Sequence, residues 1–301
     1  MKTAIWTKTA ALAGAWILAT VLTANAKTIS VSPPTASKGT YGSYVRMTWP
    51  ANAYARKGYN VYRTTTPVFR SAVRLGTTKS RVWVDRKAGA AREYWYWVEP
   101  VGYKLIAGQR ALSRQGGYRH FAVPTPKISR STAGVTIKWN PSAQAKKGYR
   151  IYRGTSPSFA LASALANTTA RSYVDRSAYP GRTYYYWIAV RGYNVTVHNA
   201  SKRRAGFRNL VVPTPSGKWT GTAYSDPFYI SWSSVYGATK YQIYRGTSSA
   251  NATLLYTTTG TGLYDYSVPH DGTWYSYWVC PIDIENRPWC DTSKCVRARN
   301  N

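Results

Sequence analysis

Four landmarks recur in the same order three times along this chain, with a period of about 90 residues. Each copy holds an alternating apolar segment that ends in Trp, a segment with the pattern Tyr-x-x-Tyr-Arg, a single Asp and an aromatic run. The copies comprise 45–49, 59–63, Asp85 and 94–97; 135–139, 149–153, Asp175 and 184–187; and 228–232, 241–245, Asp265 and 275–278. A chain with this repeat is expected to fold as three similar units.

The landmarks have the character of antiparallel β-strands. They alternate apolar with other residues, are rich in β-branched and aromatic side chains, and are bounded by clusters of Gly, Pro, Asn or Ser. No stretch of residues 27–301 has a sustained 3.6-residue apolar period, which a surface helix would need. Short strands in units of this length predict an all-β protein made of three tandem two-sheet sandwiches.

The first 26 residues have the layout of a secretory signal peptide. Lys2 and Lys8 supply positive charge, residues 10–22 are almost entirely apolar, and residues 24–26 form a small-residue cleavage site. We therefore expect a mature chain that begins at Lys27 and is secreted, either extracellular or associated with the cell surface, with a periplasmic location as a further possibility. The alternative is an uncleaved N-terminal anchor, because a signal and a short anchor share this pattern. No second apolar run follows, so no transmembrane segment is expected in the mature chain.

The Trp, the Tyr-x-x-Tyr-Arg segment, the Asp and the run 180–187 resemble strands B, C, E and F of fibronectin type III repeats in exported bacterial proteins. The lead-ins 37–41 and 221–226 resemble the first strand of those repeats. The resemblance implies immunoglobulin-like repeats over 27–126, 127–215 and 216–301, with Val-Pro-Thr-Pro joints at 123–126 and 212–215. It also implies that the recurring Trp fills the core and that Tyr94, Tyr184 and Tyr275 form tyrosine corners. Repeat 1 departs from the pattern, since residues 88–91 lack the Pro-Gly that precedes strand F in repeat 2.

All three cysteines lie in the last repeat. The resemblance implies a Cys280–Cys290 disulfide across a hairpin, which leaves Cys295 free or linked to another chain. A Cys290–Cys295 bridge is the alternative. No second group of Cys or His lies at a metal-ligating spacing, so we expect neither a metal site nor a cofactor.

Charge is distributed unevenly among the three repeats. Residues 27–126 carry 17 basic and 3 acidic groups, residues 127–215 carry 15 and 1, and residues 216–301 carry 7 and 6. The net charges of +14, +14 and +1 predict that the first two repeats attract a polyanion such as a polysaccharide, a nucleic acid or an acidic envelope surface. A solvated basic face is the alternative. The candidate contacts are Arg56, Lys57, Lys146, Lys147, Lys202, Arg203 and Arg204.

The aromatic runs offer a second candidate surface. If alternate residues of each run face the core, the residues between them face outward and could form a stacking platform for sugars or bases. The candidates are Trp95, Trp97, Tyr185, Trp187 and Trp278. The alternative is that neighbouring side chains of the same sheet cover each Trp.

Catalysis finds little support in the sequence. His120, His198 and His270 fall at unmatched positions, and none belongs to a known nucleophile motif. The recurring Asp is expected to accept hydrogen bonds at a turn or to pair with Arg63, Arg153 or Arg245. We therefore predict a secreted, non-catalytic binding or adhesion protein. A structural spacer or matrix protein is the alternative, followed by an accessory module of an exported polysaccharide-degrading system; a protein partner is also possible.

Overall fold

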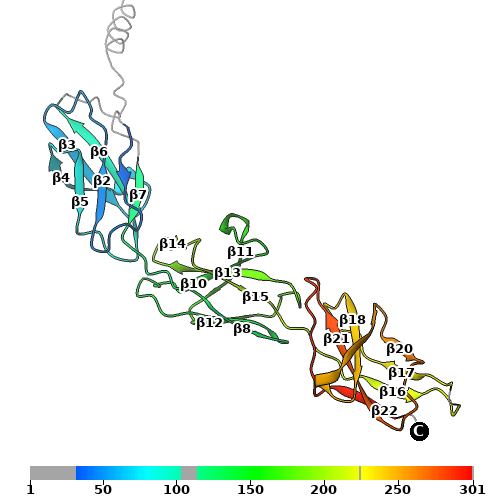
Figure 1. The fold of residues 1–301 in the computed structure, drawn as a ribbon. Coiled ribbons are helices and arrows are strands. Elements are labelled where there is room, and N and C mark those ends of the chain that lie inside the picture. The colour runs from blue at the N-terminus through cyan, green and yellow to red at the C-terminus, as the bar shows by residue number, and fades with distance from the viewer. Residues whose placement is uncertain (1–31, 103–113, 224, 300–301) are drawn as a thin grey trace, which may run out of the picture. The chain divides into compact units, whose positions relative to one another are not determined.

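The computed structural model describes residues 32–102, 114–223 and 225–299, and within these ranges the secondary structure is strands and three short 3-10 turns. The predicted signal peptide lies outside the described residues. The chain divides into two compact units, residues 1–121 with 192–195, and residues 122–191 with 196–301. The described strands form six antiparallel sheets. We call them the first, second and third sheet pair in chain order (Figure 1).

The first sheet pair joins a three-stranded sheet of order β1-β2-β5 to a four-stranded sheet of order β4-β3-β6-β7. The strands of the smaller sheet are Thr35–Ala36, Val45–Thr48 and Val82–Asp85. Those of the larger sheet, in the same order as its label, are Val73–Thr78, Gly58–Thr64, Glu93–Val101 and Gln115–Tyr118. Side chains from both sheets, among them Val45, Met47, Val61 and Tyr96, form one buried core. The pair is therefore a two-layer sandwich.

The second sheet pair repeats this plan with one added strand. Its smaller sheet has the order β12-β9-β8, formed by Ser172–Asp175, Gly134–Lys138 and Lys127–Ser131. Its larger sheet has the order β11-β10-β13-β14, formed by Ser163–Thr168, Tyr149–Gly154, Tyr184–Arg191 and Thr196–Val197, while β15 (Arg203–Gly206) also pairs with β13. Val135, Ile137, Ile151 and Tyr186 are fully buried, so both sheets contribute to the core.

The third sheet pair has sheets of order β16-β17-β20 and β19-β18-β21-β22. The first comprises Ser216–Trp219, Phe228–Ser231 and Gly262–Asp265, and the second Thr253–Thr258, Lys240–Gly246, Trp274–Ile282 and Cys295–Arg299. The predicted position of the first strand is wrong in two repeats. Residues 37–41, 221–223 and 225–226 lie outside the strands, because the first strands of these sheets, β1 and β16, end before them.

The recurring Trp fills the core as predicted. Trp49, Trp139 and Trp232 are buried. Trp139 meets Tyr149 edge-on with the ring centroids 5.3 Å apart, and the equivalent pairs in the other sheet pairs lie at 5.6 and 5.4 Å. The Tyr149 hydroxyl accepts a hydrogen bond from the Ser142 amide at 2.9 Å, so the polar end of this buried ring is satisfied.

The recurring Asp holds the two sheets of each pair together. In the second pair, Asp175 Oδ2 accepts hydrogen bonds from Arg153 Nη1 at 2.8 Å and from the Tyr186 hydroxyl at 2.9 Å, while Oδ1 accepts from Ser177. The same triads are Arg63, Asp85 and Tyr96, and Arg245, Asp265 and Tyr277. The predicted Asp–Arg pairing and turn hydrogen bonds are therefore both present. A buried carboxylate is tolerated here because each of its oxygens has partners.

The turn before strand F in repeat 1 has the same left-handed backbone conformation as in the other repeats, although alanine replaces the glycine. Ala91 has φ of 60° where Gly181 has 73° and Gly272 has 70°. A left-handed backbone is costly for alanine, since its Cβ crowds the following carbonyl. The turn is retained because it places Tyr94, whose hydroxyl accepts from the Gly89 amide at 3.1 Å. Tyr184 accepts from the Tyr179 amide in the same way, which confirms both tyrosine corners.

The predicted disulfide is confirmed. Cys280, on β21, bonds to Cys290 in the segment that follows, with a Cα–Cα distance of 4.6 Å, and Cys295 is free. The tyrosine corner predicted at Tyr275 is wrong in its partner, because the Tyr275 hydroxyl donates to the side chain of Asp271 at 3.1 Å, whereas Tyr94 and Tyr184 accept from backbone amides. The third sheet pair thus shares the core of the others but differs at its outer loops.

Candidate functional site

A phenylalanine covers the outer face of the larger sheet in the first two sheet pairs. Phe159 begins the 3-10 turn Phe159–Leu161, which precedes β11. Its ring meets Tyr152 at 5.0 Å and Trp187 at 5.6 Å, both edge-on, and stacks on His198 at 3.7 Å between centroids. Phe69, which begins the turn Phe69–Ser71, meets its own Tyr62 and Trp97 at 5.1 and 5.6 Å. The phenyl ring fills the space between a strand C tyrosine and a strand F tryptophan.

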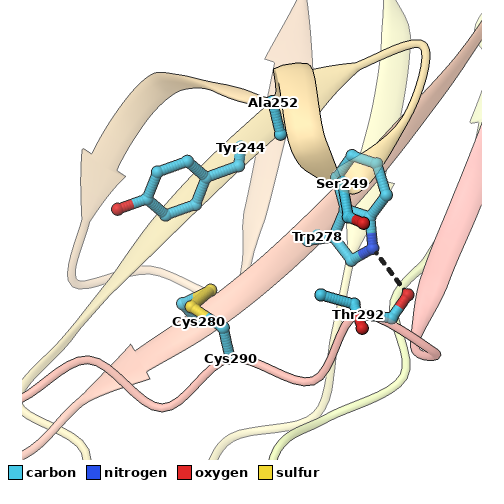
Figure 2. A pocket seen from close by; sticks show the side chains of 7 residues that line it. All are labelled: Tyr244, Ser249, Ala252, Trp278, Cys280, Cys290 and Thr292. Atoms are coloured by element: carbon cyan, nitrogen blue, oxygen red, sulfur yellow. Dashed lines mark hydrogen bonds between the residues drawn. A yellow bond between two sulfur atoms is a disulfide. The ribbon is translucent and has the colours of Figure 1, made fainter.

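The third sheet pair has serine where the other two have phenylalanine. Ser249 begins the equivalent turn, Ser249–Asn251, which precedes β19. Arg245, Arg153 and Arg63 pair with Thr253, Ser163 and Val73, so the sheet register aligns Ser249 with the two phenylalanines. A pocket of about 210 Å³ is present at this place (Figure 2). Tyr244, Ser249, Ala252, Trp278, Cys280, Cys290 and Thr292 line it.

The walls of this pocket are mainly apolar, and the polar groups of its two aromatic residues are engaged in hydrogen bonds. The Trp278 indole N–H donates to the Thr292 carbonyl at 3.0 Å, as Figure 2 shows, and the Tyr244 hydroxyl bonds to the Gln242 side chain at 3.1 Å. The disulfide forms a further wall. Ser249, Cys290 and Thr292 are exposed, so the pocket opens to solvent. We call this set of seven residues the aromatic pocket.

The expectation of an exposed aromatic platform is wrong for three of its five members. Trp97, Trp187 and Trp278 are only 2%, 0% and 7% exposed, whereas Trp95 and Tyr185 are half-buried. The alternation correctly places these tryptophans away from the core between the sheets. They are nevertheless covered, because the 3-10 turn folds over the outer face and brings its phenylalanine onto Trp97 and Trp187. The alternative is right that these tryptophans are covered, but Trp97 and Trp187 are contacted by a phenylalanine of the 3-10 turn, which is not a residue of the sheet.

Within the second sheet pair, the predicted polyanion contacts lie at two separate places. Arg56 and Lys57 precede β3, and Lys146 and Lys147 precede β10; all four are exposed. On the larger sheet of the second pair, Arg203 is opposite Trp187, whereas the Lys147 amide bonds to the Arg191 carbonyl, four residues along β13. At about 3.3 Å per residue this is roughly 13 Å along the strand. Arg203 is half-buried, and Arg204, which is exposed, bonds to the Arg203 carbonyl.

Lys202 has a structural role that the sequence prediction missed. Its ammonium donates to the Val123 carbonyl, in the first Val-Pro-Thr-Pro joint, at 2.6 Å. Lys294 donates to Val212, in the second joint, at 2.7 Å. Each lysine follows a turn in which a carboxamide or carboxylate, Asn199 or Asp291, accepts from a serine two residues on. The shared pattern Asn/Asp-x-Ser-Lys was a sequence signal for this contact. The ammonium group of each lysine is bonded to a backbone carbonyl of the same chain.

A basic hollow in the second sheet pair was not predicted as such. It measures about 490 Å³ and is open. Its lining includes Lys127, Arg130 and Arg204, all of them exposed, together with Asn140 and no acidic residue. Arg130 lies over the Phe207 ring, 4.1 Å from its centroid, which limits the freedom of its guanidinium. Three cations therefore surround one depression, and no acidic residue of the described part of the chain lines it.

The histidines and carboxylates offer no comparable arrangement. His198 packs on Phe159, and burial lowers the pKa of its imidazole. Within the described ranges, no three His, Cys, Asp or Glu side chains are placed to hold a metal ion. Among the same residues, no helix is long and apolar enough to cross a membrane.

The strand order now decides the fold. In each sheet pair a three-stranded sheet faces a larger sheet of four or five strands, the described strands pair antiparallel, and strands B and E lie in one sheet while C and F lie in the other. Each sheet pair is a fibronectin type III-like sandwich.

No protein-family model matches the sequence, and no curated protein matches it. Among solved structures, the FN1–FN3 domains of chicken CNTN1 are similar at 15% identity with a TM-score of 0.27, over 90% of this chain and 99% of that one. A two-domain fibronectin type III segment of chicken tenascin is similar at 14% identity with a TM-score of 0.43, over 59% and 99%. The chicken interferon gamma receptor alpha chain is similar at 10% with a TM-score of 0.38, over 59% and 98%.

In this fibronectin type III-like fold, the two candidate sites occupy different surfaces. The aromatic pocket lies on the outer face of the larger sheet of the third pair, against β18 and β21. The basic hollow lies in the second pair, where β8 and β15 approach each other. A ligand for one site need not resemble a ligand for the other.

Proposed function

We propose that this chain is a non-catalytic binding protein whose first two sheet pairs hold an anionic polymer. The basic hollow carries the proposal, because it adds geometry to the net charge of +14 in each of the first two predicted repeats. Lys57, Lys146 and Lys147 are exposed cations of the same parts of the chain, and they extend the attraction beyond the hollow. Lys202 is left out of the proposal because its ammonium bonds to Val123.

The proposal predicts binding to heparin that weakens steeply with salt. Binding to a polyanion releases its condensed counterions, and added salt opposes that release. Replacing Lys127 and Arg204 together with Gln should lower the slope of log affinity against log salt by about 2, since each lost contact removes about one unit. The measurement is isothermal titration of the full chain with a heparin oligosaccharide at several salt concentrations.

The matched control replaces Lys218 and Arg299, two exposed cations of the third sheet pair, with Gln. This variant removes the same charge and should leave the slope close to that of the wild type. Equal losses in the two variants would favour a diffuse basic field, as in a structural spacer retained on an acidic envelope. Salt-insensitive binding, or none, would overturn the proposal.

We also propose that the chain is exported and that its three repeats have the boundaries predicted from the sequence. The Cys280–Cys290 disulfide is typical of proteins that mature in oxidising compartments, as the predicted signal peptide 1–26 requires. We propose that the chain is secreted, and that its repeats span 27–126, 127–215 and 216–301, as in exported bacterial proteins. Mass spectrometry of the secreted protein should find Lys27 at the N-terminus. If residues 1–26 are instead still attached, they act as an N-terminal anchor.

A further inference from the structure

The third sheet pair contains a pocket whose filler is visible in the other two. Phe69 and Phe159 place a phenyl ring between a tyrosine and a tryptophan, and the shape of the cleft around them is set by those rings. Tyr244 and Trp278 occupy the same strand positions in the third pair, directly opposite each other on β18 and β21. Ser249 supplies no ring, so the aromatic walls remain without the filler they have elsewhere.

A second ring is also replaced at this position. In the second sheet pair, Val197 is opposite Val190, and His198 follows it and stacks on Phe159. In the third pair, the Trp289 amide bonds to Pro281, so Cys290 follows in the place of His198. Cys290 is tied to Cys280 by the disulfide, which holds the chain back on the sheet. Ser249 and the disulfide-bonded Cys290 thus occupy the positions of two rings, Phe159 and His198, and leave the pocket open.

We propose that the aromatic pocket receives the phenylalanine side chain of a partner protein. A phenyl ring entering between Tyr244 and Trp278 can repeat the edge-on contacts made by Phe69 and Phe159, which is the arrangement that aromatic quadrupoles favour. A sugar fits less well, because the Trp278 N–H and the Tyr244 hydroxyl already have partners. The exposed hydroxyls of Ser249 and Thr292 remain at the rim for the partner's backbone.

Charge separates this site from the proposed polyanion contact. The third predicted repeat has 7 basic and 6 acidic groups, so long-range attraction to a polyanion is weak there. Binding at the aromatic pocket should therefore change little with salt, whereas heparin binding should weaken. The two proposals can fail independently.

The test uses the full chain and the pentapeptide Gly-Gly-Phe-Gly-Gly with a 4-fluoro ring, followed by ¹⁹F NMR. We expect a saturable change in the fluorine signal that the unlabelled peptide reverses and its alanine counterpart does not. Ser249→Phe, which restores the internal filler, should weaken binding by about tenfold or more, as loss of an aromatic anchor does. Ser249→Ala is the matched control and should keep affinity within about twofold, because it leaves the pocket open.

Wild-type binding also locates the peptide without any variant. Intermolecular NOEs from the peptide ring to Trp278, identified by their loss in Trp278→Phe, are expected even if Ser249→Phe does not fold. Absence of binding, binding that Ser249→Phe leaves unchanged, or NOEs to other tryptophans would overturn the inference. Peptide affinity no higher than that of benzyl alcohol would assign the pocket to a small aromatic molecule and overturn the protein partner.

Discussion

Asp175→Asn is expected to destabilise the second sheet pair by about 3 kcal/mol, because removing one partner of a buried ion pair leaves the other partly desolvated and unpaired. Asp175 is fully buried and ties β12 to Arg153 on β10 and to Tyr186 on β13. Arg153 keeps a quarter of its side chain in solvent, which places the effect at the lower end for such pairs. Urea unfolding of the full chain, with hydrogen exchange on β10 and β13 amides, measures it.

The same variant should change how stability depends on pH. Burial alone would raise the pKa of Asp175, but hydrogen bonds from Ser177, Arg153 and Tyr186 outweigh burial and hold the pKa below its ordinary value. A carboxyl group whose pKa is lowered on folding stabilises the protein above its unfolded pKa, near 3.9, and loses this contribution as pH falls through the folded pKa. The difference between wild type and variant should therefore be full at neutral pH and shrink below about pH 4.

Tyr186→Phe provides the graded comparison for this network. It removes one hydrogen bond to Asp175 and keeps the ring and the charge, so we expect a loss of about 1 kcal/mol. If Asp175→Asn cost no more than Tyr186→Phe, the charge would not be what stabilises the junction of the two sheets. A gap between wild type and Asp175→Asn that widened in acid would contradict the lowered pKa.

Trp187→Ala should cost about 4 kcal/mol, the range typical of deleting a large buried aromatic side chain. Trp187 is 0% exposed, packs edge-on against Phe159, and donates its indole N–H to the Ala200 carbonyl at 3.0 Å. Its removal would leave a cavity under the 3-10 turn and an unpaired carbonyl. Thermal unfolding of the full chain, followed by near-ultraviolet circular dichroism, measures the loss.

Tyr185→Ala is the control for this change, because Tyr185 is the neighbouring residue on the same strand and only half-buried. We expect it to cost about 1 kcal/mol, within the usual range for partly exposed positions. Equal losses at the two positions would mean that Trp187 is no better covered than Tyr185, contrary to the packing around Phe159.

The periodicity of the sequence was sufficient to place the strands of the core. Alternating residues such as Val135, Ile137 and Trp139 must face one side of a sheet, and the matched Asp175 and Arg153 then meet at its end. The disulfide followed only from a resemblance, since spacing alone left two pairings open. The strand pattern and the family resemblance together predicted the sandwiches, the Asp–Arg pairs between their sheets and the disulfide.

The outer face of the larger sheet was not predictable by the same means. The alternation of the strand predicts on which face of the sheet Trp187 lies. Whether that face is exposed depends on the 3-10 turn that covers it, and the sequence of such a loop has no periodic pattern. A signal did exist, since phenylalanine is scarce in this chain and two of its five copies, Phe69 and Phe159, lie 90 residues apart after Pro-x. The contact of Lys202 with Val123 was missed because it joins residues 79 positions apart, and the repeated Asn/Asp-x-Ser-Lys pattern marks the lysine without identifying its acceptor.

The two lysine contacts with the Val-Pro-Thr-Pro joints indicate which segment of the chain would be duplicated as a unit when a repeat is added. Lys202 holds the Val-Pro-Thr-Pro segment that precedes its own sheet pair, and Lys294 does the same for the next. Each joint is therefore structurally part of the sandwich that follows it. A duplicated segment that starts at the joint therefore carries both the donor and the acceptor of this contact.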